Sequence, residues 1–174
     1  MGAPFFDECL PVLTATPAAL DALLRGLPEA WTMVTEGPGT WSPYVVLGHL
    51  IHGEKTDWIP RLEGILQYGC SQPFETFDRE AQFRDSAGKS LADLLDEFRE
   101  LRAANVARLR ALDLQAEQLD LQGMQPAFGA VTMRQLLATW TAHDLGHIVQ
   151  VSRVMAKRYK QDVGPWAAYL SVMN

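Results

Sequence analysis

Cysteine is scarce in this sequence: the chain of 174 residues has only Cys9 and Cys70, and neither belongs to a CxxC motif. A disulfide framework or a cysteine-based zinc site needs more cysteines at closer and more regular spacing. Two isolated cysteines are typical of free thiols in a reducing compartment, so we expect a cytoplasmic protein with both thiols reduced.

Basic charge is also in short supply. The chain has 15 lysines and arginines against 21 aspartates and glutamates, a formal net charge of −6 at pH 7. Binding of nucleic acid through its phosphates needs an excess of positive charge, so we expect no DNA or RNA partner.

Long apolar runs are missing as well. No segment approaches the roughly 20 apolar residues of a membrane span. The first residues, Met1–Asp7, carry neither a basic signal-like region nor the Ser or Thr of a myristoylation pattern. We therefore expect no membrane attachment.

What the sequence does contain is helical periodicity. Apolar residues recur at spacings of three and four, no segment has the alternation of a strand, and the composition is 48% hydrophobic. A short helix is expected over residues 5–13, and helix-start signals then occur at Thr16-Pro17, Ser42-Pro43, Ser90 and Thr132. The expected long helices cover residues 16–27, 42–69, 90–112 and 132–160.

Two features modify this simple pattern. Pro60 removes one backbone donor inside the second long helix and should kink it. The connections over residues 70–89 and 113–131 are long for a bundle, which favours crossovers over an up-and-down topology, and we expect residues 70–89 to be solvated rather than to form a lid. The sequence thus predicts one all-α domain over residues 1–174, a four-helix bundle with long crossover connections.

Two histidines stand in the middle of the last predicted helix. His143 and His147 are four residues apart on the apolar face of that helix, so both rings point into the core. Each buried neutral ring must place one donor and one acceptor, and a metal ion would take both acceptors at once. The pair predicts half of a metal site, and two hydrogen-bonded core histidines are the alternative.

A third ligand would come from the second long helix, which carries His49 and His52. Because its first turns are apolar nearly all round, periodicity does not choose between the two histidines. A three-histidine site keeps an open coordination position and favours Zn²⁺ or Ni²⁺, with Fe²⁺ and Co²⁺ as alternatives. A water or thiol bound there would be strongly acidified.

Charged residues near these histidines have less distinctive patterns. Arg102 and Asn105 fall on the apolar stripe of the third long helix, and we expect them at its margin with their polar ends in water. The alternative is that Arg102 faces a polar cavity. Asp144 points about 100° away from His143 on a helix. The carboxylates of the second helix, Glu54 and Asp57, are expected to be solvated or to support the ligands rather than act as bases.

Several short motifs in fixed order resemble the DinB-like superfamily. They are Trp41-Ser42-Pro43, Gly48-His49-Leu50, Trp140 through Gln150 and Val163-Gly164-Pro165-Trp166, and the likeness extends to Thr16-Pro17 and residues 101–105. The resemblance implies a four-helix bundle in which His49, His143 and His147 hold a divalent metal, and so it selects His49 over His52.

The resemblance also implies a class of reaction. Some members are metal-dependent transferases or isomerases that use a low-molecular-weight thiol such as bacillithiol, mycothiol or glutathione on a small electrophile. If Arg102 faces the cavity, it is a candidate to bind the carboxylate of such a thiol cofactor. One alternative is a non-catalytic metal-binding or stress-related bundle. Another is a bundle with core histidines and no metal, and a homodimer is expected in all three cases.

Overall fold

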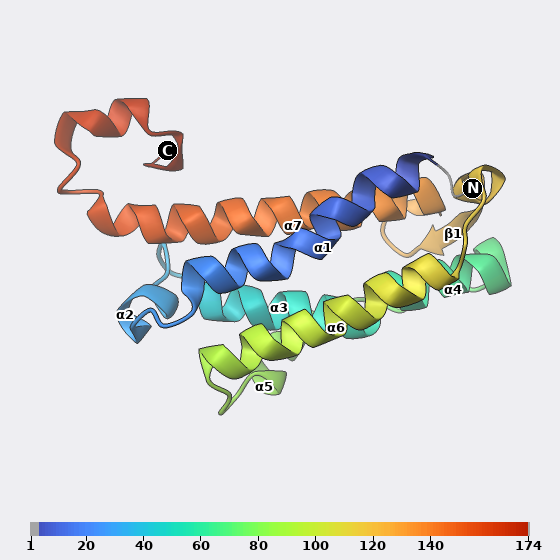
Figure 1. Ribbon diagram of the computed structural model, residues 1–174, viewed down its shortest axis with the longest axis horizontal. Coiled ribbons are helices and arrows are strands. Elements are labelled where there is room, and N and C mark those ends of the chain that lie inside the picture. The colour runs from blue at the N-terminus through green and yellow to red at the C-terminus, as the bar shows by residue number, and fades with distance from the viewer. Residues whose placement is uncertain (1–3, 174) are drawn as a thin grey trace.

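The computed structural model describes residues 4–173, and its long helices form a bundle (Figure 1). The long helices are α1 (Pro4–Leu24), α3 (Pro43–Thr56), α4 (Trp58–Tyr68), α6 (Leu91–Ala111) and α7 (Met133–Ala156). The shorter elements are α2 (Glu29–Thr32), α5 (Ala81–Asp85), β1 (Gln122–Gln125), β2 (Gly129–Thr132) and the 3₁₀ helices η1 (Gly69–Ser71), η2 (Ala116–Asp120), η3 (Lys157–Tyr159), η4 (Gly164–Tyr169) and η5 (Ser171–Met173). The predicted all-α four-helix bundle is confirmed, with α3 and α4 together forming one of its four rods. Expectations about Met1–Ala3 lie outside the described residues.

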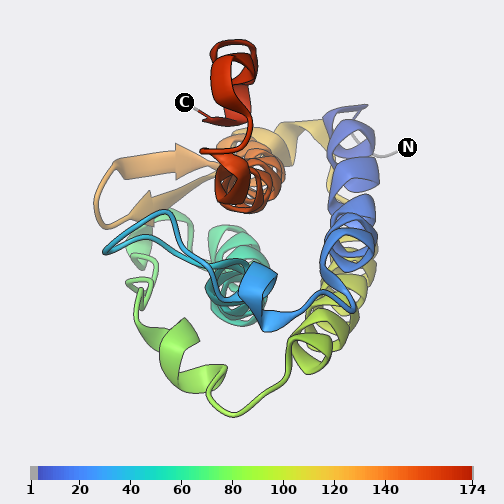
Figure 2. The same ribbon diagram turned by 90° about the vertical axis from the view of Figure 1, so that its left-hand side faces the viewer.

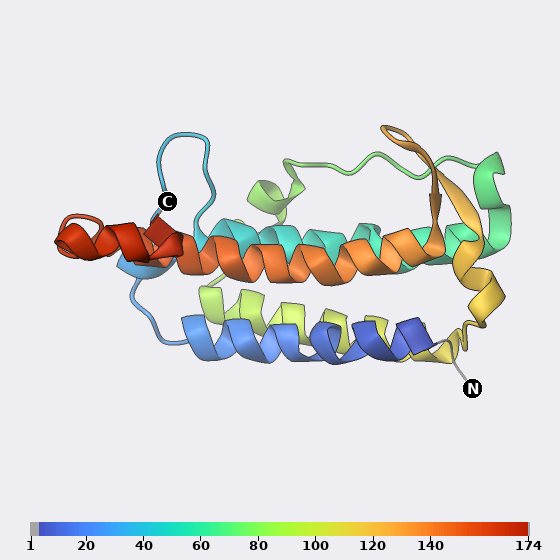
Figure 3. The same cartoon turned by 90° about the horizontal axis from the view of Figure 1, so that it is seen from above.

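The four rods do not alternate in direction along the chain. α1 and α7 run one way and α3–α4 and α6 run the other way (Figures 1 and 3). α1 and α3 each pack against α6 and α7, so α1 and α3 lie on a diagonal (Figure 2). The long connection after α4 returns the chain to the end where α3 began, which lets α6 run parallel to α3. None of the described helices is both long and apolar enough to cross a membrane.

Three of the four predicted helix starts are confirmed by their caps. The Ser42 hydroxyl accepts a hydrogen bond from the Val45 amide at the start of α3. Ser90 and Thr132 each form a complete capping box, in which side chain and backbone satisfy each other at the first turn. These local interactions explain why the starts of α3, α6 and α7 could be read from the sequence.

The expected start at Thr16-Pro17 is wrong, because α1 continues through it from Pro4 to Leu24. The Thr16 hydroxyl donates to the carbonyl of Val12 within the helix instead of capping a new one. Pro17 has no amide to donate to the Leu13 carbonyl four residues earlier. That carbonyl accepts a hydrogen bond of 2.9 Å from Nη1 of Arg102, which replaces the missing helical bond.

The expected kink at Pro60 is confirmed as a break at Asp57, where α3 ends and α4 begins. Pro60 cannot donate to the carbonyl of Thr56, so the helical ladder is interrupted there.

The expectation of no strand is wrong for the connection before α7, where β1 and β2 pair as an antiparallel hairpin. The strand sequences Gln-Gly-Met-Gln and Gly-Ala-Val-Thr are short and contain few large apolar residues, so they show no clear alternation.

A buried cluster of charges lies midway along the bundle. Arg102 on α6 is 1% exposed and forms a two-pronged contact with Asp144 on α7, in which Nη2 lies 3.0 Å from Oδ1. The same Nη2 donates to Glu54 on α3 at 2.8 Å, and the Asn105 amide donates to the second Glu54 oxygen at 2.9 Å. Glu54 also accepts from the indole of Trp140 at 3.2 Å. The expectation that Arg102 lies at a solvated margin is therefore wrong.

This charge cluster separates two apolar clusters of the core. One cluster contains Trp58, Leu62 and the first half of α7, and the other contains Leu47 and Phe98 from the opposite half of the bundle. Carboxylates and a guanidinium in such a position are tolerated because every charge has a partner of opposite sign.

Arg102→Met should lower the free energy of unfolding by about 3–5 kcal/mol, because it leaves two buried carboxylates without a countercharge. Urea unfolding followed by circular dichroism measures the change. The matched control is Arg99→Met, since Arg99 lies on the same helix with its side chain 57% exposed, and it should stay within about 0.5 kcal/mol of wild type. A similar small loss for both variants would contradict the role given to Arg102.

A second ion-pair group fastens the connection between α2 and α3 to the end of α7. Both Glu36 oxygens accept hydrogen bonds from Arg153, at 2.7 and 2.8 Å, and Lys157 lies 3.0 Å from one of them. The hydrogen bonds from Arg153, with a further contribution from Lys157, lower the pKa of Glu36 from 4.5 to about 2.

Glu36→Gln should destabilise the protein by about 1 kcal/mol at pH 7. Since the folded state lowers the pKa of Glu36, its stabilising effect is complete above pH 4.5 and is lost as the pH falls toward 2. Thermal unfolding of both proteins between pH 7 and 3 should thus show a converging difference. Glu29→Gln is the control, because Glu29 is exposed and has no ion pair among the described residues. A constant difference across this pH range would contradict the linkage.

Candidate metal centre

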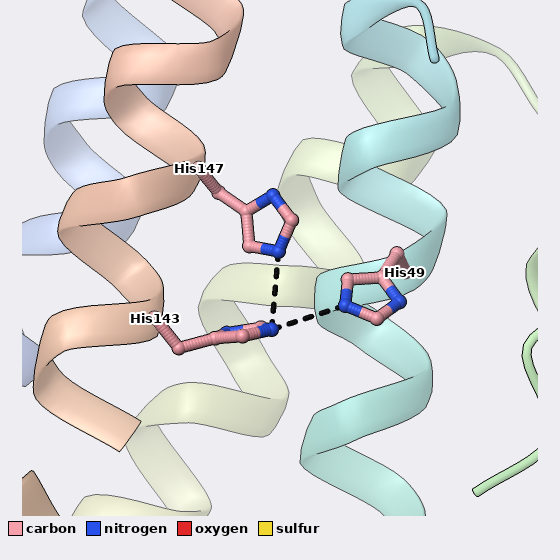
Figure 4. A group of neighbouring side chains, drawn as sticks. All are labelled: His49, His143 and His147. Carbon is pink, nitrogen blue, oxygen red and sulfur yellow. Dashed lines mark hydrogen bonds between the residues drawn. The ribbon is translucent and has the colours of Figure 1, made fainter. Parts of the chain in front are cut away.

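Three histidine rings, one from α3 and two from α7, meet between these two helices (Figure 4). Nε2 of His143 lies 3.0 Å from Nε2 of His49 on α3 and 3.0 Å from Nε2 of His147, one turn along α7. One nitrogen from each ring lies within 4.8 Å of the other two. In a tetrahedral zinc site with bonds of 2.0–2.1 Å, nitrogen ligands are about 3.3 Å apart, so the spacing of the rings fits such an ion.

Aromatic side chains hold each ring in place. Trp41 stacks nearly parallel to His147 at 6.4 Å between ring centroids and also contacts His49 at 4.9 Å. Trp58, the first residue of α4, meets His143 edge-on at 5.2 Å and stacks on Trp140. The positions of the three rings therefore depend on packing from tryptophans just beyond both ends of α3.

Burial keeps the three rings uncharged. Burial, with a smaller contribution from the neighbouring histidines, lowers the pKa of His49 to about 4 and that of His143 to about 3. Burial also lowers the pKa of His147, although its hydrogen bond to Gln150 opposes the change. At neutral pH each ring thus offers a lone pair, which is what a metal ion requires of histidine.

The outer ring nitrogens differ in their support. Nδ1 of His147 pairs with Oε1 of Gln150 at 2.8 Å, which is the arrangement that orients many metal-binding histidines. Nδ1 of His49 and Nδ1 of His143 are buried and have no hydrogen-bond partner among the described residues. Their orientation depends on the aromatic packing instead.

The structure separates the two histidines of α3. His49 joins the cluster, whereas His52 lies against Phe77 and 3.8 Å from Asp85, outside the three-ring group. The expectation that Arg102 binds the carboxylate of a cofactor is wrong. Arg102 is buried, pairs with Glu54 and Asp144, and is not among the residues that line the pocket described next.

A cavity of about 570 Å³ opens onto the histidine cluster. Five aromatic side chains contribute to its wall, and polar or charged groups complete it. The aromatic residues are Trp41, Trp58, Phe74, Phe77 and Phe128, and the polar or charged residues besides the histidines are Asp57, Arg61, Glu75, Thr76, Arg79, Gln125, Gln135 and Thr139. Such a wall fits a small molecule with an apolar body and a few polar groups.

Two connecting segments cover this cavity. Residues 74–77 and Arg79 belong to the long connection after α4, and residues 125–128 form the tip of the β1–β2 hairpin. A hydrogen bond from the Phe74 amide to the Met124 carbonyl joins the two segments. The expectation that residues 70–89 form only a solvated crossover is therefore wrong for this part, which lies on the α3–α7 side of the bundle (Figure 2).

Reasoning from the sequence missed the polar wall of the pocket. The pair Asp57 and Arg61 lines it, and the two residues have the four-residue spacing of a helical ion pair. That spacing could have indicated the Asp57–Arg61 ion pair from the sequence alone. For Gln125 and Gln135 the sequence offers no comparable pattern.

The comparisons with known proteins agree with this architecture. A family model described as the DinB superfamily matches residues 13–151. Among solved structures, the chain is similar to YfiT from Bacillus subtilis, described as a probable metal-dependent hydrolase with an unusual four-helix bundle topology. The TM-score is 0.76 at 21% sequence identity, over 88% of this chain and 87% of the other, so the likeness is one of fold. Among curated proteins, no sequence matches this chain.

Proposed function

We propose that this chain, which belongs to the DinB superfamily, is a divalent-metal-dependent enzyme that acts on small, largely apolar molecules. The observation that supports this most directly is the cluster of three uncharged histidine nitrogens facing an aromatic pocket. A metal held only for structure is usually enclosed by four protein ligands, whereas three ligands beside a cavity are typical of catalytic sites.

His49, His143 and His147 would hold the ion, with Zn²⁺ or Ni²⁺ as the favoured metals for a set of three imidazoles. A divalent ion there supplies Lewis acidity, which lowers the pKa of a thiol or water bound beside it. The residues of the chain supply the rest: aromatic rings fix the ligands, and the apolar wall excludes water from the reacting groups.

For the reaction itself we propose transfer of a low-molecular-weight thiol onto a small electrophile. The cavity volume lies within the range of pockets that take drug-sized ligands, which leaves room for a thiol together with a second molecule. Exposed Arg79 on the pocket wall suits the carboxylate that such thiols carry. Hydrolysis is the competing reaction, and it is favoured by the description of YfiT.

Metal content is the first test. Protein purified without chelator, with any histidine tag removed, should contain about one divalent ion per chain by elemental analysis. His147→Ala should lose most of it, because two remaining ligands bind far more weakly. His52→Gln is the matched control, since His52 lies on α3 outside the cluster, and its metal content should equal that of wild type. Wild-type protein without stoichiometric metal would contradict the proposal.

Turnover then distinguishes the two reactions. Metal-loaded protein is assayed with chlorodinitrobenzene plus glutathione or bacillithiol, and separately with nitrophenyl acetate and no thiol. We expect thiol-dependent turnover that chelation abolishes and added metal restores. Ester hydrolysis without thiol would replace the transferase by a hydrolase. Metal-loaded protein that turns over neither probe would favour a non-catalytic metal-binding bundle.

A further inference from the structure

One carboxylate stands in line with a metal-ligating histidine on α3. His49, Gly53 and Asp57 follow one another at intervals of four residues, and all three line the pocket. The Asp57 amide donates to the Gly53 carbonyl at 3.0 Å, so the helical spacing continues through Asp57. The Cα atoms of His49 and Asp57 are thus about 12 Å apart along the helix.

Gly53 lets the indole of Trp58 pack close to the helix backbone between these two side chains. It has no side chain, and a Cβ built there would lie 3.3 Å from Nε1 of Trp58. Helical side chains lean toward the N-terminus of their helix, so those of His49 and Asp57 lean the same way and keep this spacing. His49 and Asp57 line the same pocket, so a molecule bound there can contact the histidine cluster and this carboxylate together.

Asp57 is not used in the way its position suggests. It is the residue before α4, where aspartate commonly caps the helix by accepting a backbone hydrogen bond. Here the side chain makes no capping bond and is instead only 12% exposed on the pocket wall. A buried carboxylate that does no capping is costly unless something else uses it.

The other carboxylates near the pocket are less suited to proton transfer. Glu54 and Asp144 are occupied by Arg102 inside the core. Glu75 lines the pocket but is exposed to solvent. Apart from the histidines, Asp57 is therefore the buried proton acceptor among the described residues of the pocket wall.

Arg61 holds this carboxylate in place. Its Nη2 lies 2.5 Å from Oδ1 of Asp57, and its guanidinium packs over Phe74 at 5.3 Å. No well-aligned hydrogen bond reaches that buried oxygen within the described residues, so the contact is mainly one of charge. Burial raises the pKa of Asp57, and Arg61 opposes the rise. A raised pKa suits a group that must both take and return a proton.

We propose that Asp57 is the general base and acid of the reaction, an inference that rests on the proposed function. The proton of the thiol S–H, or of the water O–H, passes to the Asp57 carboxylate as the freed electron pair forms the bond to the electrophilic carbon. An alkoxide or phenolate leaving group departs with its bonding pair and takes the proton from Asp57, whereas a halide departs as the free anion and Asp57 releases the proton to water. The carboxylate is regenerated, and no group is oxidised or reduced.

Asp57→Asn tests this in metal-loaded protein with whichever probe the wild type turns over. The kcat should fall about 10²- to 10⁴-fold, because the amide cannot accept the proton. Metal content and KM should change little, and Asp57→Glu should restore part of the rate. The matched control is Glu63→Gln on α4, where Glu63 pairs with Arg108 outside the pocket. This control should keep the wild-type kcat.

The pH profile distinguishes a base from a structural residue. The charged and titratable groups that share the pocket with Asp57 are Arg61 on α4, Glu75 and Arg79 on the connection, His49 on its own rod, and His143 and His147 on α7. Arg61→Gln removes the charge that opposes the raised pKa, so the acid limb of kcat should move to higher pH. In Asp57→Asn this limb should disappear from the residual rate.

A measurement without turnover completes the test. In metal-free protein, carbon NMR of the aspartate carboxyls should show one resonance that titrates above the ordinary pKa of about 3.9. The pKa of this resonance should rise in Arg61→Gln. The resonance should be absent from Asp57→Asn, which assigns it to Asp57. The Arg61→Gln result keeps the proposal testable if Asp57→Asn folds poorly.

The outcomes separate the two proposals. Active wild type with an equally active Asp57→Asn would overturn the role of Asp57 and leave the metal enzyme standing. Loss of metal from Asp57→Asn, or an equal loss of rate in Asp57→Glu with an unchanged pH profile, would make it a structural residue. Metal-loaded wild type that turns over no probe would remove the proposed function and this inference together.

Discussion

The buried guanidinium of Arg102 joins all four rods of the bundle, and the geometry of the site depends on it. Arg102 lies on α6 and binds the Leu13 carbonyl of α1, Glu54 of α3 and Asp144 of α7. Asp144 directly follows His143, and Glu54 lies five residues after His49. Because each carboxylate can satisfy the guanidinium in only one helix register, the same contacts set α3 against α7 and bring their histidines together.

The parts of the site that the sequence predicts are those determined by a single helix. His143 and His147 share a face because of helical geometry alone, so their spacing was sufficient. The orientation of His49 depends on which faces of α3 are covered. α3 packs against α5, α6 and α7, and a helix covered on several sides has no single apolar face from which to read an orientation. The family motif supplied what periodicity could not.

The parts that the sequence did not predict arise from pairing between distant segments. Arg102 meets its carboxylates across 42 and 48 residues of chain. A charge on a helix is by default read as solvated, because its partner is known only once the helices are packed. For the same reason the position of Asp57 on the pocket wall could not be predicted from the sequence. At Pro17 the sequence instead predicted a feature that is absent. A proline typical of a helix start lies inside α1, where a side chain from another helix satisfies the carbonyl that it leaves free.

The separation of the ligands along the chain has a consequence for assembly. His49 and His143 are 94 residues apart, and α3 must pack against α7 before their rings can meet. A metal ion held between them would act as a removable cross-link that closes about half of the chain into a loop, and it would bind the folded chain far better than the unfolded one. Resistance of the bundle to unfolding would then rise with the supply of free metal, which makes metal availability a determinant of how long the protein lasts.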